Sequence, residues 1–266
     1  MKVIDAYKAS PYLSIKYDNY FKIYEDNLKK FVGKKITFIE VGVLNGGSLF
    51  MWRKFFGKKA RIIGIDFNPE AKKWENYGFE ILIGDQSDPT FWDKQLKKIS
   101  TIDVLVDDGG HSNLQQIVTT EKTIEKIKDG GMLIVEDTHS NYMSSFGNPS
   151  RYSFIAFTKK IIDSIHQRSY LLNLQEKKYS SLVYSIQFYD SIAVMHIDRK
   201  LCKKSKLLQN KKGKLEKDYR YHKAQSRYKS FARLIASNQF TKKIAVSLYY
   251  KIQSITHLSK IFRKFR

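Results

Sequence analysis

The sequence predicts an α/β fold with a mostly parallel sheet, a C-terminal antiparallel hairpin and a separate basic helical extension. Short β-branched and aromatic runs alternate with helical patterns of about 10 to 15 residues, which is typical of βαβ crossovers. The runs in the first half also end in acidic or Gly-rich clusters. Ligands bind outside the carboxyl ends of the strands in open parallel sheets, so these clusters predict one binding crevice.

Each element follows from its local pattern. Aromatic and apolar residues at helical spacing predict a helix from Lys16 to Phe31, within an N-terminal helical cap of residues 1–34. After Pro149, a helix over 150–172 leads to a predicted hairpin at the sheet edge. The remaining strands are predicted at 36–41, 61–66, 79–84, 102–106 and 132–135, the hairpin strands at 182–188 and 191–197, and two helices at 49–56 and 113–127. One domain is therefore predicted over residues 1–198.

The composition excludes several classes of protein. The 266 residues are 42% hydrophobic, which is enough for a core and too apolar for a disordered chain. The single cysteine, Cys202, excludes an internal disulfide framework and a four-cysteine zinc site. The sequence has neither an apolar run of spanning length nor a signal-peptide core near its start. These features predict a cytoplasmic protein.

The net charge of +22 arises almost entirely in the last quarter of the chain. Residues 199–266 hold 21 of the 48 Lys and Arg residues but only 2 of the 26 Asp and Glu residues. Apolar residues from Ile244 to Phe262 recur every three or four positions, which predicts an amphipathic helix. Three roles stay open for this basic tail: peripheral binding to the anionic inner face of a membrane, nucleic-acid docking, or a solvated extension.

The first three strand ends predict a cofactor that has no phosphate. Glu40 opens the loop after the first strand, where it would repel a pyrophosphate and suit a cationic ligand. Asp66 ends the second strand and is placed for two ribose hydroxyls, while Asp85-Gln86 ends the third and is placed for an adenine. S-adenosylmethionine combines adenosine with a positive centre and is the predicted cofactor. The predicted cofactor residues are Glu40, Gly42, Gly46, Ser48, Asp66, Asp85, Gln86 and Asp108.

Acidic residues after the fourth and fifth strands predict a metal site. Asp108 follows the fourth strand, and Glu136 and Asp137 follow the fifth. Carboxylates that converge without basic partners repel one another, and a hard cation removes that cost. We therefore expect Mg²⁺ or another divalent cation on these three residues.

Two histidines and one tyrosine are candidates for the chemistry and for the acceptor. His111 lies in the cluster Asp107-Asp108-Gly109-Gly110-His111, and its ordinary pKa suits a general base near neutral pH. His139 is a second candidate, for proton transfer or substrate contact. Tyr142 is a candidate for lining the acceptor pocket.

Several motifs carry a family resemblance in combination. They are Lys16-Tyr17 through Tyr24-Glu25, residues 38–49 (FIEVGVLNGGSL), Met51-Trp52, residues 63–69 (IGIDFNP), 85–88 (DQSD), 106–111 (VDDGGH) and 135–142 (VEDTHSNY). Together they resemble class I S-adenosylmethionine-dependent sugar O-methyltransferases of the macrocin and mycinamicin type, over residues from about 15 to 198. The resemblance implies a Rossmann-like sheet and a divalent metal, usually magnesium. Gly110 and Met143 depart from the family pattern beside the acceptor, so they leave its identity open.

The function predicted on this basis is metal-dependent methyl transfer from S-adenosylmethionine to a sugar hydroxyl. The acceptor would belong to surface-glycan (capsule or lipopolysaccharide) or natural-product biosynthesis. One alternative is methylation of nucleic acid docked by the basic tail, although no Asn-Pro-Pro-Tyr-like loop follows the fourth strand. A non-catalytic module that keeps the cleft is another. The oligomeric state is open, with a homo-oligomer among the alternatives.

Overall fold

The computed structural model describes residues 1–146, 150–169, 172, 178–210 and 212–214, and the single residues 248, 251, 252 and 255. The chain divides into two compact units, Met1–Lys206 and Leu207–Arg266. Arg199, the residue after the predicted boundary at 198, donates hydrogen bonds of 2.9 Å to the Asp129 carboxylate and the Ile127 carbonyl. The amphipathic helix predicted from Ile244 to Phe262 lies largely outside the described residues.

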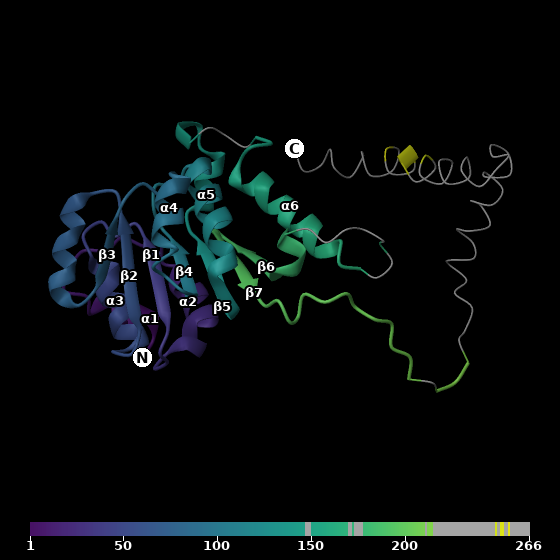
Figure 1. Cartoon of the computed structure of the whole chain (residues 1–266), viewed down its shortest axis with the longest axis horizontal. Helices are drawn as coiled ribbons and strands as arrows, with labels where there is room; N and C mark the ends of the chain where they lie inside the picture. Colours follow the sequence, from purple (N-terminus) through teal and green to yellow (C-terminus); the bar gives the residue numbers. More distant parts are fainter. Residues whose placement is uncertain are drawn as a thin grey trace. The chain divides into compact units, whose positions relative to one another are not determined.

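A seven-stranded sheet forms the centre of the first unit (Figure 1). Its strands are β1 (Thr37–Val41), β2 (Arg61–Asp66), β3 (Glu80–Ile83), β4 (Ile102–Asp107), β5 (Ile127–Val135), β6 (Val183–Tyr189) and β7 (Ile192–Ile197). The spatial order is β3-β2-β1-β4-β5-β7-β6, with β7 antiparallel to both of its neighbours and all other pairs parallel. The predicted mostly parallel sheet with a terminal hairpin is confirmed. The order reverses between β1 and β4, which is where such sheets bind ligands.

Helices cover both faces of the sheet (Figure 1). They are α1 (Val3–Lys8), α2 (Tyr20–Leu28), α3 (Gly47–Phe56), α4 (Pro89–Gln95), α5 (Asn113–Thr123) and α6 (Phe154–His166), with short 3-10 helices η1 (Lys29–Phe31), η2 (Pro69–Tyr77), η3 (Ile124–Lys126), η4 (Thr138–Tyr142), η5 (Ser144–Phe146) and η6 (Lys178–Ser181). Phe38 packs in the core under α1, α2 and α3, and its neighbour Ile39 packs in the core under α4, α5 and α6. Alternation along β1 thus builds two separate cores. No helix of the described residues has the length and apolar character needed to cross a membrane.

Some element boundaries differ from the predicted ones. The helix predicted from Lys16 begins at Tyr20, so Lys16 lies in an irregular segment before α2. The strand predicted from Met132 begins at Ile127, and a register shift between β4 and β5 accommodates the extra residues. The helix predicted over 150–172 begins at Phe154, because the Ser153 hydroxyl caps it by accepting from the Ala156 amide.

Candidate active site

One cavity of about 750 Å³ lies at the carboxyl ends of the parallel strands. Its lining includes the predicted cofactor residues Gly42, Asp66, Asp85, Gln86 and Asp108, together with His111 and Asp137. These residues come from the loops after β1, β2, β3, β4 and β5, which meet at one edge of the sheet. Glu40, Gly46, Ser48 and Glu136 are not among the lining residues.

Gly42 allows the loop after β1 to pack directly on the loop after β4. Its φ is +87°, and a Cβ built on it would lie 2.1 Å from the Asp108 carbonyl oxygen. Asp66 holds the same loop from β2, because its Oδ2 accepts from the amides of Val43 at 2.8 Å and Leu44 at 3.0 Å. The carboxylate predicted to bind ribose hydroxyls therefore shapes the cavity wall as well as lining it.

Glu40 lies beneath this loop rather than in the cavity. Its side chain is fully buried, and its carboxylate accepts from Ser48 Oγ at 2.7 Å and Trp52 Nε1 at 2.8 Å. Burial raises the pKa of Glu40 to about 7. Gly46 packs tightly against the Trp74 ring, where a Cβ would lie at 2.4 Å. Three of the predicted cofactor residues thus support the loop after β1 from inside the protein: Glu40, Gly46 and Ser48.

Gln86 lines the cavity and fastens the loop after β4. Its Nε2 donates to the buried Asp107 at 2.9 Å and to Thr119 at 3.2 Å. Its Oε1 accepts from the Gly110 amide at 2.8 Å. The side-chain amide of Gln86 thereby fixes the loop that carries Asp108 and His111.

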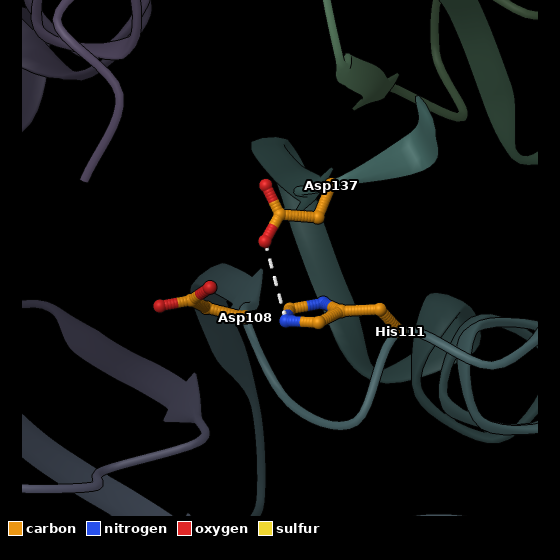
Figure 2. A group of neighbouring side chains, drawn as sticks. All are labelled: Asp108, His111 and Asp137. Carbon is orange, nitrogen blue, oxygen red and sulfur yellow. Dashed lines mark ion pairs between the residues drawn. The ribbon is translucent and has the colours of Figure 1, made fainter. Parts of the chain in front are cut away.

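Asp108, His111 and Asp137 form a cluster on the cavity wall (Figure 2). Each offers one ligand atom, and these atoms all lie within 4.8 Å of one another. The Asp137 carboxylate points at the imidazole, with Oδ2 lying 3.2 Å from His111 Nε2, whereas the Asp108 carboxylate points away from it (Figure 2). Two carboxylates and one imidazole on the wall of a cavity are a donor set that fits a divalent cation with open positions.

The backbone at this cluster is strained. His111 has φ +59° and Asp137 has φ +53°, in the left-handed region that non-glycine residues seldom adopt. The Ser140 hydroxyl holds the first of these turns by donating to the His111 carbonyl at 2.8 Å. Strain of this kind persists where the surrounding structure fixes it, and it concentrates at functional sites.

Glu136 lies behind the cluster and is fully buried. Tyr24 donates its hydroxyl to Oε1 at 2.5 Å, and Lys16 Nζ donates to Oε2 at 2.9 Å. The same ammonium lies 2.5 Å from Asp108 Oδ2. Burial, and after it the charge of Asp108, raises the pKa of Glu136 well above its ordinary value. The expectation of acids without basic partners was wrong, since Lys16 is one.

Three residues spaced by four bind the three predicted metal ligands. Lys16 bonds to Asp108 and Glu136, Tyr24 bonds to Glu136, and Tyr20 donates its hydroxyl to Asp137 Oδ1 at 2.5 Å. In the sequence, Tyr20 and Tyr24 indicate only the packing face of a helix. Tyr20 and Tyr24 lie one turn apart on α2 and place their hydroxyls on one side of the helix, and that spacing is the signal that could have marked them. Lys16 precedes the helix, so this spacing does not mark it.

His139 and Tyr142 lie at a second cavity, of about 530 Å³, between η4, α6 and the β6–β7 hairpin. His139 Nδ1 is buried and has no hydrogen-bond partner among the described residues, and its ring contacts Tyr17 edge-on with centroids 5.6 Å apart. Tyr142 is 61% exposed. The structure thus places the two histidines at different cavities, with His111 at the larger one.

Comparison with known proteins gives curated relatives of one kind, whereas no family model matches the chain. Over 162 residues it is 27% identical to the 8-demethyl-8-alpha-L-rhamnosyl tetracenomycin-C 2'-O-methyltransferase of Streptomyces olivaceus, covering 57% of this chain and 42% of that protein. Over 164 residues it is 26% identical to the mycinamicin VI 2''-O-methyltransferase of Micromonospora griseorubida, covering 57% and 39%. The matched region thus spans only about two fifths of these relatives.

Solved structures agree on the fold. The methyltransferase MycE of the mycinamycin biosynthetic pathway, in complex with Mg and SAH, superposes with a TM-score of 0.71 at 19% identity, over 85% of this chain and 60% of that one. At this identity the likeness shows the fold, which is the Rossmann-like methyltransferase sheet. The chain is thus similar to the class I sugar O-methyltransferases of the macrocin and mycinamicin type, as its motifs predict.

Proposed function

We propose that this chain transfers a methyl group from S-adenosylmethionine to a sugar hydroxyl with the help of a divalent cation. One observation carries the proposal: a single cavity has the loop of Gly42 and Asp66 on its wall and also the cluster of Asp108, His111 and Asp137. Cofactor and acceptor would therefore meet in one space. The names of the curated relatives and the Mg and SAH of the MycE complexes support the same assignment.

The cofactor side of the cavity suits a cationic adenosine derivative. The whole cavity has a volume of about 750 Å³, which is within the range of small-molecule sites. Asp66 and Asp85 lie at the ends of β2 and β3, where they would hold the ribose and the adenine end. S-adenosylmethionine would supply an electrophilic methyl group on a sulfonium, whose positive charge is compatible with an acidic wall.

The acceptor side has groups that can orient and deprotonate a hydroxyl. A divalent cation on Asp108 and Asp137, with Glu136 as the third predicted ligand, would bind the acceptor hydroxyl and lower its pKa. His111 then takes the hydroxyl proton as the acceptor oxygen bonds to the methyl carbon and the bond from carbon to sulfur breaks. Asp137 orients the imidazole through the 3.2 Å contact with Nε2.

The acceptor class is proposed from the relatives. Those proteins are named for methylation of tetracenomycin, mycinamicin and macrocin compounds, which favours a sugar on a natural product. A capsule or lipopolysaccharide sugar, and membrane association through residues 199–266, stay separate proposals. Flotation of the protein with anionic and neutral liposomes tests the second, since an electrostatic anchor requires lipid charge.

Methyl transfer to a panel of glycosylated natural products and nucleotide sugars tests the function. We expect calorimetric binding of S-adenosylmethionine and transfer that EDTA abolishes and Mg²⁺ restores. His111→Gln should lower kcat by about a hundredfold or more, whereas His166→Gln, at the exposed end of α6, should leave it unchanged. If S-adenosylmethionine does not bind, the proposed function is wrong. If EDTA does not affect methyl transfer, only the proposed dependence on a divalent cation is wrong.

A further inference from the structure

Lys16 occupies the position of a cation among the predicted metal ligands. Its Nζ lies 2.5 Å from Asp108 Oδ2 and 2.9 Å from Glu136 Oε2, and its side chain is 2% exposed. Glu40, also fully buried, is a third acidic side chain near this ammonium. The proposed reaction assigns no role to this buried lysine, so its pairing with the predicted metal ligands needs a separate explanation.

We propose that the Lys16 ammonium is an exchangeable counter-ion, which pairs with Asp108 and Glu136 in the metal-free protein and which the divalent cation displaces. The inference rests on the metal of the proposed function. Lys16 is then neither a ligand nor a catalytic residue. It is a competitor that sets the metal affinity of the site.

The geometry requires the exchange if Glu136 is to bind a cation. One carboxylate oxygen of Glu136 accepts from Tyr24, and the other accepts from Lys16. An ammonium and a divalent cation on the same oxygens would repel each other strongly at that distance. With Lys16 in place, Asp108, His111 and Asp137 can offer ligand atoms; with Lys16 displaced, the predicted set of Asp108, Glu136 and Asp137 becomes available.

The segment that carries Lys16 allows the movement. Residues 9–19 contain no helix or strand, only turns and bends at residues 9, 11–12 and 18–19, so few backbone hydrogen bonds have to break. The adjacent Ile15 is 71% exposed and lines the large cavity. The lysine side chain can therefore reach solvent through the cavity opening.

The arrangement also explains what lysine does before a metal arrives. A buried carboxylate that loses its partner leaves an uncompensated charge, which strongly destabilises a fold. Lys16 removes that cost for Asp108 and Glu136 in the metal-free protein. The site then stays folded without metal, at the expense of weaker metal binding.

Calorimetry with MgCl₂ on the full chain tests the exchange. Lys16→Met removes the competitor and should bind Mg²⁺ about tenfold tighter or more than wild type, with a larger rise of Tm on adding Mg²⁺. Lys22→Met is the matched control, because Lys22 pairs with Asp26 on the exposed face of α2 and should behave like wild type. Equal or weaker binding by Lys16→Met overturns the exchange. If wild type and variant both fail to bind Mg²⁺, the metal part of the proposed function fails with it, and the S-adenosylmethionine titration then judges the methyltransferase proposal separately.

A measurement on the wild-type protein tests the displacement of Lys16 by Mg²⁺ even if Lys16→Met does not fold. Amine acylation read by mass spectrometry reports whether each lysine is accessible. We expect Lys16 to be protected in EDTA and to react several-fold faster at saturating MgCl₂, with Lys22 as the internal reference. Unchanged protection of Lys16 while calorimetry shows bound Mg²⁺ would contradict the displacement.

Discussion

The Tyr20 hydroxyl donates a 2.5 Å hydrogen bond to Asp137 Oδ1, so a residue of α2 holds a carboxylate that follows β5. The other oxygen of the same carboxylate contacts His111 Nε2 at 3.2 Å. Tyr20 therefore fixes the orientation of Asp137 toward the imidazole. Helix α2 is in this way part of the site, although Tyr20 is 117 residues from Asp137 in the sequence.

Replacing Tyr20 with Phe should lower kcat by about tenfold while the protein stays folded. The hydrogen bond to a charged group is lost, and such a bond contributes about 1.5–3 kcal/mol. Steady-state kinetics and thermal unfolding measure the two effects separately. Tyr17→Phe, which changes an exposed tyrosine of the same segment, is the control. Unchanged kcat in Tyr20→Phe would mean that Asp137 does not need this support.

Asp66→Asn should weaken S-adenosylmethionine binding by about tenfold or more. The carboxylate accepts from the Val43 and Leu44 amides and lines the cavity, so its loss affects both the loop and the direct contact. Calorimetry gives the dissociation constant. Asp93→Asn removes an exposed acid paired with Lys122 and should bind the cofactor like wild type. Equal affinity in the two variants would remove Asp66 from the cofactor site.

Gly42→Ala should destabilise the protein more than Gly78→Ala. The two glycines have φ of +87° and +79°, so both substitutions introduce backbone strain, which is about 1–2 kcal/mol for a residue in the left-handed region. Only at Gly42 does the new Cβ meet another group, the Asp108 carbonyl oxygen at 2.1 Å, whereas nothing lies within 4 Å at Gly78. Chemical denaturation of both variants isolates the clash. Equal losses would show that the two loops separate easily.

Glu40→Gln should change the dependence of stability on pH. Burial raises the pKa of Glu40 from 4.5 to about 7 in the folded protein, so the folded state keeps a proton that the unfolded state releases. Stability then falls as pH rises between these values, by on the order of 3 kcal/mol. Glutamine cannot ionise, so the stability gained by the variant should grow from pH 5 to pH 8. Burial also raises the pKa of Asp107 to about 7. Asp107 therefore adds the same dependence of stability on pH to the wild-type protein and to Glu40→Gln.

Denaturation of Glu40→Gln at several pH values provides the check, with Glu70→Gln as the exposed control. The glutamine can still accept one of the hydrogen bonds from Ser48 and Trp52, so the loop should remain in place. A stability difference that is the same at pH 5 and pH 8 would show that Glu40 ionises normally.

The sequence by itself determined the sheet and the residues at its edge. Periodicity revealed the strands and the hairpin because buried strands are apolar and turns need glycine or acidic residues. The acids and glycines that follow those strands had to meet at one edge, because all carboxyl ends of a parallel sheet lie together. The sequence alone therefore predicts that one cavity brings together Asp66, Asp85, Asp108 and His111, and all four line it.

Only the tertiary structure decided which side chains face the cavity and which face the interior. Glu40 is the penultimate residue of β1 and Asp66 is the last residue of β2. Glu40 turns inward to Ser48 and Trp52, whereas Asp66 turns to the loop and the cavity. The partners of Glu136 come from more than a hundred residues away, where Lys16 and Tyr24 read as an ordinary helical pattern. Local sequence encodes the periodicity of helices and strands. The ion-pair partner of a buried carboxylate depends instead on long-range packing, and the spacing of residues along the chain does not specify which side chains that packing brings together.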